Sequence, residues 1–289
     1  MERIFFFSDS PADLLPEETA GKPYRMVPSS VIYGDGRVIR ETEVDRWEYY
    51  EYLKTCSTIP GSAMGTPEQW IEAFTEAIDA GYTHGIVLTI SSTASSVYQS
   101  INLAQEAIEA DRPGAFTIEL IDSRLYSMLY GRLVLESLEK IAEGRSFQEV
   151  VDFLRERLKL SLGIIGAYSL RCMQKSGRIS GMAAFAGGVL GIKPVLLAHD
   201  GVIAPVEKVR GERNLAPALT KHIKERIVDP AGQDIILIHG SIPNGELDRL
   251  EALLLEEVKP RSVQRHSIGV TVASNCGPET IAVSFFGKP

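Results

Sequence analysis

The stretch THGIVLTISSTASSVYQS, residues 83–100, decides the fold class because it joins a short apolar run to a loop rich in hydroxyl side chains. The run at residues 86–88 is β-branched and closes at Ile90, which is typical of a buried parallel strand. Residues 91–95 then form a loop. After that loop, apolar residues recur with spacings of four, three and four, which predicts one helix lasting to about residue 109: Val97, Ile101, Ala104 and Ile108.

A loop of this kind is suited to an anion. A strand that feeds a helix points backbone N–H groups, the helix dipole and nearby hydroxyls at one spot outside the carboxyl end of the sheet. A nucleophile, a phosphate and a carboxylate all fit such a spot, and so does plain capping of the backbone. The chain contains no GxSxG, GxGxxG or GxxxxGK[ST] sequence. A hydrolase nucleophile elbow, a dinucleotide fold and a P-loop therefore lack their usual motifs, and an anion clamp remains.

Composition narrows the class of protein. The 289 residues carry 38 acidic and 30 basic side chains, and this net charge of −8 argues against a general nucleic-acid or anionic-membrane surface. The most apolar segment, residues 181–198, is interrupted by Lys193 and Pro194, so no stable membrane insertion is expected. We expect a cytoplasmic protein without a metal or a cofactor. The cysteines are odd in number and show no paired spacing, which fits a reducing compartment: Cys56, Cys172 and Cys276.

The first half alternates strand and helix signals, which predicts a parallel sheet covered on both faces. Two capping boxes mark helix starts, Thr66 with Gln69 and Ser146 with Glu149. Strands are expected at residues 4–7, 27–32, 86–90 and 117–121. Helices are expected at residues 44–53, 67–80, 95–109, 126–142 and 147–160.

The regular alternation of strand and helix signals ends near residue 160, where we place a boundary between domains 1–160 and 161–289. A hairpin through Asp200-Gly201 joins strands at 192–197 and 202–209, so the second domain contains antiparallel pairing. Residues 181–190 predict a small-residue helix that either packs closely or walls an elongated apolar cavity. Further strands are expected at residues 162–169, 235–239, 263–268 and 280–286, and helices at 214–227 and 246–258.

Four other positions are candidate site residues, each with a plain structural alternative. Asp9 follows the first strand and lies at the edge where open α/β sheets bind ligands, or it fixes a turn together with Ser10. Ser62 precedes the capped helix at 67–80, or is part of an ordinary loop. Arg178 and Arg210 lie in basic loops that form either a phosphate-reading or partner-docking rim or a solvated surface.

Seven segments, in order and spacing, resemble the DegV family of bacterial fatty-acid-binding proteins. They are FSDSPADLLPE, PGSAMGTPEQWIEAFTEAIDAGY, ISSTASSVYQSI, IDSRLYSMLYGRLV, SLRCMQKSGRIS, GGVLGIKPVLLAHDGVIAPVEKVRG and NCGPETIAVSFF, and they cover essentially the whole chain. The resemblance implies a two-domain α/β fold. Its first domain would be a three-layer α/β/α unit with a parallel sheet, and its second a two-layer α/β unit with a mixed sheet, with a ligand tunnel between them.

The same resemblance implies a carrier and not an enzyme. Such proteins hold a long-chain fatty acid in a buried tunnel, and some present it to a separate ATP-dependent fatty acid kinase that makes the acyl phosphate. Arg178 and Arg210 match basic positions of the family and would meet the kinase or the phosphoryl group. Matching motif to motif, the fatty acid carboxylate would be held by hydroxyls at four positions: Ser62, Ser91 and Ser92, with Ser95 close by.

This chain also departs from the family pattern. Its NCGPE segment places Asn275 where relatives have histidine, and Glu279 where they have the second glycine of a Gly-Pro-Gly motif. Asn275 donates hydrogen bonds to a ligand but carries no positive charge, and an inward-pointing Glu279 would repel an anion. Two alternatives stay open, a lipid binder without a kinase partner and a serine-dependent acyl hydrolase or acyltransferase using Ser92 or Ser95.

Overall fold

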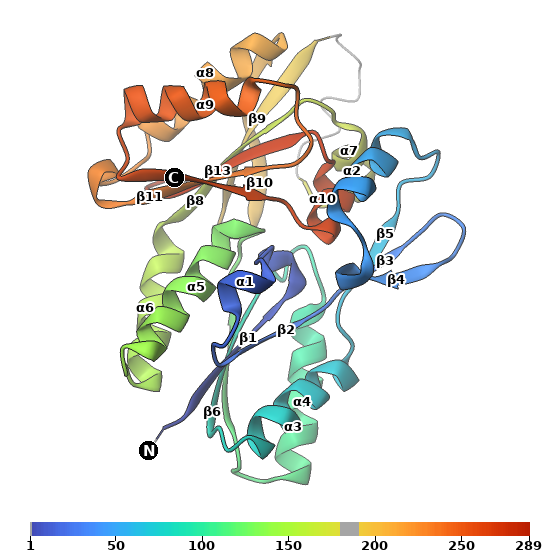
Figure 1. The fold of residues 1–289 in the computed structure, drawn as a ribbon, viewed down its shortest axis with the longest axis vertical. Coiled ribbons are helices and arrows are strands. Elements are labelled where there is room, and N and C mark those ends of the chain that lie inside the picture. Colours follow the sequence, from blue (N-terminus) through green and yellow to red (C-terminus); the bar gives the residue numbers. More distant parts are fainter. Residues whose placement is uncertain (1, 180–190) are drawn as a thin grey trace.

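The structure, a computed structural model, describes residues 2–179 and 191–289, and these residues form three sheets (Figure 1). The first sheet has four strands in the order β2-β1-β6-β7, and every neighbouring pair is parallel. This confirms the parallel sheet predicted from the first half of the sequence. Its strands are β1 (Ile4–Asp9), β2 (Tyr24–Val27), β6 (His84–Thr89) and β7 (Thr117–Asp122).

Helices cover both faces of this sheet, two on each side (Figure 1). The helices on one face are α3 (Pro67–Asp79) and α4 (Val97–Asp111), and those on the other are α5 (Met128–Ala142) and α6 (Phe147–Leu160). Both predicted capping boxes are present, at Thr66 and at Ser146. The predicted stripe of α4 is buried along its whole length, with no member more than 3% exposed: Val97, Ile101, Ala104 and Ile108.

The second sheet is mixed and has six strands in the order β10-β9-β8-β13-β11-β12. Its neighbouring pairs are antiparallel except for the parallel pair β11 and β12. The predicted hairpin turn is confirmed, because Asp200 and Gly201 both have positive φ, 46° and 79°. The strands are β8 (Ser161–Ala167), β9 (Ile192–His199), β10 (Val202–Arg210), β11 (Asp234–His239), β12 (Ser262–Ser267) and β13 (Thr280–Phe286).

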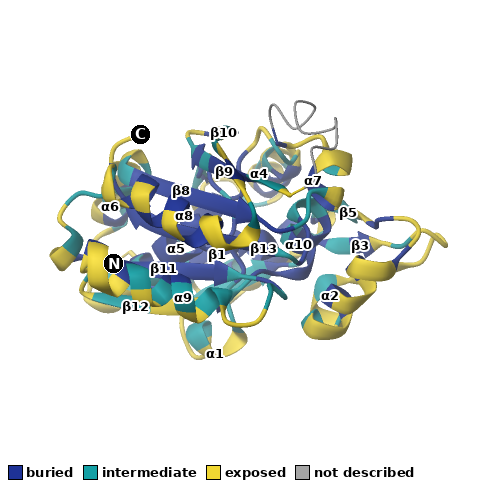
Figure 2. Cartoon of the chain, turned by 90° about the horizontal axis from the view of Figure 1, so that it is seen from above, coloured by how far each residue is buried: buried dark blue, intermediate teal, exposed yellow. Residues whose placement is uncertain are grey.

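Successive side chains along these strands point to opposite faces of the mixed sheet, and each face packs into its own hydrophobic core. One face packs against α8 (Leu215–Lys224) and α9 (Glu246–Leu253), which continues into a π-helical turn (Leu254–Val258). The other face turns toward α5, so α5 packs between the parallel and the mixed sheet. Figure 2 shows the central strands β1, β8 and β13 buried, while the outer sides of α8, α9 and α2 are exposed. Among the described residues, no helix is both long and apolar enough to cross a membrane.

A third, antiparallel sheet projects from the side of the molecule and was not predicted (Figure 1). The single strand expected at residues 27–32 is wrong, because Pro28 separates β2 from β3 and its ring nitrogen has no N–H to continue a ladder. The strands are β3 (Ser30–Ile32), β4 (Val38–Arg40) and β5 (Gly61–Ala63), and they lie beside α2 (Arg46–Thr55).

Three short helices were also not predicted: α1 (Pro16–Thr19), α7 (Arg171–Ser176) and α10 (Val270–Cys276). The helix expected at residues 181–190 lies outside the described residues. Gly131 in α5 makes one of the closest backbone approaches in the molecule, since a Cβ there would lie 2.2 Å from the carbonyl oxygen of Ala12. Glycine therefore lets α5 seat against the turn that follows β1.

Candidate functional site

A cavity of about 580 Å³ lies where the carboxyl edge of the parallel sheet meets the inner face of the mixed sheet. Of the seven site residues to which the family resemblance gives a role, five line the cavity, and Ser91 and Arg210 do not. The five come from β5, the loop after β6, the segment after α7, and α10: Ser62, Ser92, Ser95, Arg178 and Asn275. These five residues form part of the polar wall of the cavity.

The rest of the cavity wall is mainly apolar. Residues that face one another across the central strands of the mixed sheet form its floor, because Ala282 pairs with both Ile165 and Ile238. Side chains from helices, loops and strand β10 complete the wall, and they include Ile90, Leu129, Met173, Ile179, Ile203, Ile268 and Val272. A cavity with clustered hydroxyls in an apolar wall suits a ligand with a polar head and an apolar body.

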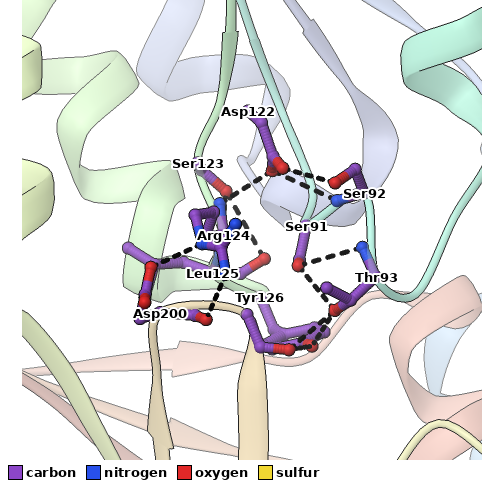
Figure 3. Close-up of polar contacts among 10 residues, drawn as sticks. Ser91, Ser92, Thr93, Asp122, Ser123, Arg124, Leu125, Tyr126 and Asp200 are labelled. Carbon is purple, nitrogen blue, oxygen red and sulfur yellow. Dashed lines mark hydrogen bonds and ion pairs between the residues drawn. The ribbon is translucent and has the colours of Figure 1, made fainter.

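The hydroxyls of the loop after β6 are not equivalent. Ser92 donates from its backbone N–H (3.1 Å) and its hydroxyl (2.5 Å) to the carboxylate of Asp122 (Figure 3). Ser95 instead accepts a hydrogen bond from the Val97 N–H (3.2 Å) and so caps the start of α4. Ser62 forms no side-chain hydrogen bond to another described residue. Its hydroxyl is thus available to a ligand, whereas the Ser92 hydroxyl must turn away from Asp122 to donate.

Ser91 shapes the loop and does not line the cavity. It is fully buried, and its hydroxyl shares a 2.8 Å hydrogen bond with Thr93. The Thr93 hydroxyl donates to the carbonyl oxygen of Gly201 (2.6 Å), and Tyr126 donates to the same oxygen (2.9 Å). Arg124 binds Asp200 beside it, through an ion pair of 2.5 Å (Figure 3). The tip of the β9–β10 hairpin is therefore fastened to the loop that carries the serines.

Arg178 brings a positive charge to the polar wall. Its guanidinium donates to the carbonyl oxygen of Ala94 (3.0 Å) in the serine loop and to the side-chain oxygen of Asn275 (2.8 Å). Asn275 in turn donates to the Thr271 carbonyl one turn earlier in α10 (2.8 Å). The amide thus orients the cation, although it carries no charge itself. Glu279 is not among the residues that line the cavity.

Asp9 and Ser10 have structural roles, and neither lines the cavity. The buried carboxylate of Asp9 accepts hydrogen bonds from the Ile90 N–H (3.1 Å) and the Tyr130 hydroxyl (2.8 Å), and burial raises its pKa to about 7. Asp9 therefore fixes the backbone at Ile90, where the chain leaves β6. Ser10 donates to Glu41 (2.6 Å) and accepts from the N–H of Ser29 (2.9 Å).

Two acidic side chains, Glu41 and Asp13, lie beside Gly269 at the start of α10, the helix that carries Asn275. Glu41 accepts hydrogen bonds from the N–H (3.1 Å) and the hydroxyl (2.8 Å) of Thr271. Asp13 accepts from Ser127 through one oxygen, and its other oxygen has no hydrogen-bond partner among the described residues. Burial, with the charge of Glu41 adding to it, raises the pKa of Asp13 to about 7.

Replacing Asp13 with asparagine is expected to stabilise the protein above pH 7. A carboxyl group whose pKa is raised from 3.8 to about 7 on folding contributes stability below pH 3.8, and that contribution is lost as the pH rises through 7. Asp13→Asn removes the cost of ionising the buried group and keeps a side chain that tolerates the local φ of 60°. The expected gain is on the order of 4 kcal/mol at pH 8, vanishing near pH 4.

Urea unfolding of wild type and Asp13→Asn between pH 4 and pH 8 measures this gain. Asp152 is exposed on α6, so Asp152→Asn serves as the control and should follow the wild-type pH profile. A constant difference between Asp13→Asn and wild type across the range would show that Asp13 is ionised in the folded protein throughout.

The described residues that line the cavity include no serine or cysteine paired with a histidine. Burial raises the pKa of the Cys276 thiol to about 12, which keeps it protonated at neutral pH. Among the described residues that line the cavity there is no histidine, and the partner of Ser92 is a carboxylate. Across residues 2–179 and 191–289, no cluster of three or more histidine, cysteine or acidic side chains is placed to hold a metal ion. The geometry favours binding of an amphipathic ligand.

Comparison with known proteins assigns the chain to a family. A family model described as "Uncharacterised protein, DegV family" matches residues 3–288. The chain belongs to the DegV family. A DegV domain-containing protein of Staphylococcus aureus is 30% identical over 291 residues, covering 99% of this chain and 98% of its own.

Solved DegV structures share the fold. A DegV family protein from Thermus thermophilus, described as binding fatty acid, has a TM-score of 0.86 at 24% identity and covers 99% of each chain. A fatty acid binding DegV family protein from Streptococcus agalactiae also has a TM-score of 0.86 at 24% identity and covers both chains fully. The expected DegV fold, with a parallel and a mixed sheet, is confirmed.

In this DegV protein, nine hydroxyl or amide side chains that line the cavity were not singled out from the sequence: Ser29, Thr93, Ser96, Gln99, Tyr126, Ser127, Ser176, Thr271 and Thr280. Thr93 and Ser96 lie in the predicted hydroxyl loop, so their residue type was a usable signal. Which hydroxyls of that loop face inward depends on its coiled path between β6 and α4, and no periodicity reports that path. Tyr126 had no local signal, because its role depends on the distant Gly201 carbonyl.

Proposed function

We propose that this DegV protein binds a long-chain fatty acid and does not transform it. The carboxylate lies among the hydroxyls of Ser62, Ser92 and Ser95, next to Arg178 and Asn275. The acyl chain fills the apolar remainder of the cavity. The observation that carries the proposal is a single cavity of about 580 Å³ that joins this polar cluster to a wall of isoleucine, leucine and methionine. The DegV relatives described as fatty-acid-binding support it.

The energetics support a tightly held ligand. About fifteen methylenes at about 0.8 kcal/mol each contribute about 12 kcal/mol before the costs of ordering are subtracted. A buried carboxylate requires several donors, because one hydroxyl does not replace its hydration. The guanidinium of Arg178, the hydroxyls and the start of α4 provide them together.

We further propose that the fatty acid lies between two domains, residues 1–160 and 161–289. The parallel sheet is built only from strands before residue 160, and the mixed sheet only from strands after it. The cavity takes its serine loop from the first set and its floor from the second.

A role as the carrier subunit of an ATP-dependent fatty acid kinase rests on two arginines. Arg178 lies at the polar wall, where it could contact a phosphoryl group formed on the carboxylate, and Arg210 lies outside the cavity at the end of β10, where a partner could reach it. Acyl phosphate formation on adding kinase and ATP tests this role. A protein that binds fatty acid but yields no acyl phosphate with kinase from the same cell would be a lipid binder without that partner.

Mass spectrometry of the purified protein under native conditions tests the fatty acid itself. We expect a mass excess equal to a free fatty acid, with the same acid in an organic extract of the sample. Removing two hydroxyls in Ser62→Ala/Ser92→Ala should weaken binding by about 2 kcal/mol, or about 30-fold, because each hydrogen bond contributes about 1 kcal/mol.

Ser91→Ala is the matched control, since Ser91 lies in the same loop but does not line the cavity. Equal losses in Ser91→Ala and the double variant would assign the effect to loop structure. An empty protein that also fails to bind added fatty acid would exclude the proposal.

A further inference from the structure

A second cavity, of about 350 Å³, lies between helices α5 and α6 and the β11–β12 edge of the mixed sheet. Charged side chains line much of it. The cations are Arg132, Lys140, Arg157 and Arg261, and the carboxylates are Glu136, Glu139 and Asp234. A chain with a net charge of −8 thus has a local surplus of positive charge at this cavity.

Most of these charges are already paired. Arg261 binds both oxygens of Asp234, at 2.8 and 2.5 Å. Lys140 pairs with Glu143 (3.0 Å) outside the cavity lining. The half-buried Arg157 is different, because its guanidinium has no hydrogen bond or ion pair to any residue in the described part of the chain.

Arg157 is held by two aromatic rings, Phe286 and Phe153, and not by an acid, and its guanidinium carbon lies 5.7 Å from the centre of the Phe153 ring. Its guanidinium carbon lies 4.6 Å from the centre of the Phe286 ring, and that of Arg132 lies 4.0 Å from the same centre. Two like charges therefore share one ring, and one carboxylate, Glu136, binds Arg132 (3.1 Å). Burial and the neighbouring Arg157 lower the pKa of Arg132, which is the direction expected when positive charge is incompletely compensated.

We propose that this cavity binds the phosphoryl group of a small molecule, with Arg157 as its principal ligand. The guanidinium fork matches two phosphoryl oxygens, and the Gln264 amide on β12 provides a neutral donor from the opposite wall. A phosphoryl group offers more oxygens than a carboxylate and so reaches donors on both walls. Leu135, Phe153 and Ile236 give the rest of the molecule an apolar surface.

The site is separate from the proposed fatty acid cavity, since none of the described residues lines both. It joins α6, from before residue 160, to β12, from after it. A bound phosphoryl group would therefore connect the parallel-sheet and mixed-sheet parts of the molecule.

Titration of the full-length protein with inorganic phosphate tests the proposal, with sodium chloride at matched ionic strength as the control for screening. We expect saturable binding by calorimetry and a rise in the thermal unfolding midpoint with phosphate only. Arg157→Gln should weaken phosphate binding about 10-fold or more, as loss of a charge-assisted hydrogen-bonding fork predicts. Arg155→Gln is the matched control, because Arg155 lies on the same helix but points to Glu119 (2.5 Å) and does not line the cavity.

Arg157→Lys keeps the charge without the planar fork and should bind phosphate with intermediate affinity, so it tests the site even when Arg157→Gln is unstable. Equal phosphate binding by wild type, Arg157→Gln and Arg155→Gln would overturn the proposal, as would a wild-type response no greater than that to chloride. The fatty acid content of each variant, measured in the same samples, should stay at the wild-type level.

Discussion

Replacing Ala282 with phenylalanine is expected to abolish binding of a long acyl chain. Ala282 lies on β13 in the floor of the cavity, between Ile165 and Ile238 on the neighbouring strands. A phenyl ring there occupies the path of the chain. Excluding about four methylenes costs about 3 kcal/mol, so palmitate binding should weaken about 100-fold or more. Octanoate, which needs less of the cavity, should lose much less affinity.

Displacement of a fluorescent fatty acid from the delipidated protein measures both affinities. Ala282→Ser adds little volume and serves as the control that the strand tolerates substitution. Palmitate binding at wild-type strength in a folded Ala282→Phe protein would show that the chain does not lie over this floor, and the placement of the acyl chain would be wrong.

Replacing Gly131 with alanine is expected to destabilise the protein by about 3 kcal/mol, the upper range for overpacking a core. The added Cβ would lie 2.2 Å from the carbonyl oxygen of Ala12 and 2.8 Å from the sulfur of Met128. The carbonyl is backbone and cannot rotate away, so α5 must move off the turn after β1. Because α5 also packs on the mixed sheet, this shift disturbs both cores.

Urea denaturation gives the free energies of unfolding for this comparison. Gly61→Ala is the control, since a Cβ at Gly61 would meet only Ile32, at 3.9 Å. It should change stability by less than about 0.5 kcal/mol. If Gly131→Ala lowered the free energy of unfolding by a similarly small amount, the turn at Ala12 would be able to move away from α5 at little cost.

The elements that could be predicted are those encoded locally. The capping boxes at Thr66 and Ser146, the apolar stripe of α4 and the Asp200-Gly201 turn each depend on residues a few positions apart. Helix α10, in contrast, depends on a residue far away in the sequence. Its sequence, VTVASNC, is rich in β-branched residues with low helix propensity. The carboxylate that caps it, Glu41, lies 230 positions earlier in the chain.

The candidate site also contains residues that the local sequence indicates and residues whose position depends on distant parts of the chain. A serine-rich loop between a strand and a helix indicates a candidate binding loop. The local sequence also singled out Ser62 and Arg178, and the family resemblance added Asn275. The sequence could not reveal that Ser91 turns into the protein to bind Thr93, while Ser92 turns to Asp122. Nor could it place Arg210 outside the cavity, since that depends on the length and direction of β10.

The position of β13 in the mixed sheet has a consequence for biosynthesis. This strand is the last of the six in sequence, yet it pairs with β8 on one side and β11 on the other. Until residue 286 has left the ribosome, β8 and β11 have no partner between them and each exposes an open hydrogen-bonding edge. The nascent chain therefore cannot complete the cavity until the end of translation, because the floor at Ala282 is assembled last. A message cut short before β13 would yield chains with exposed strand edges, which aggregate or are degraded.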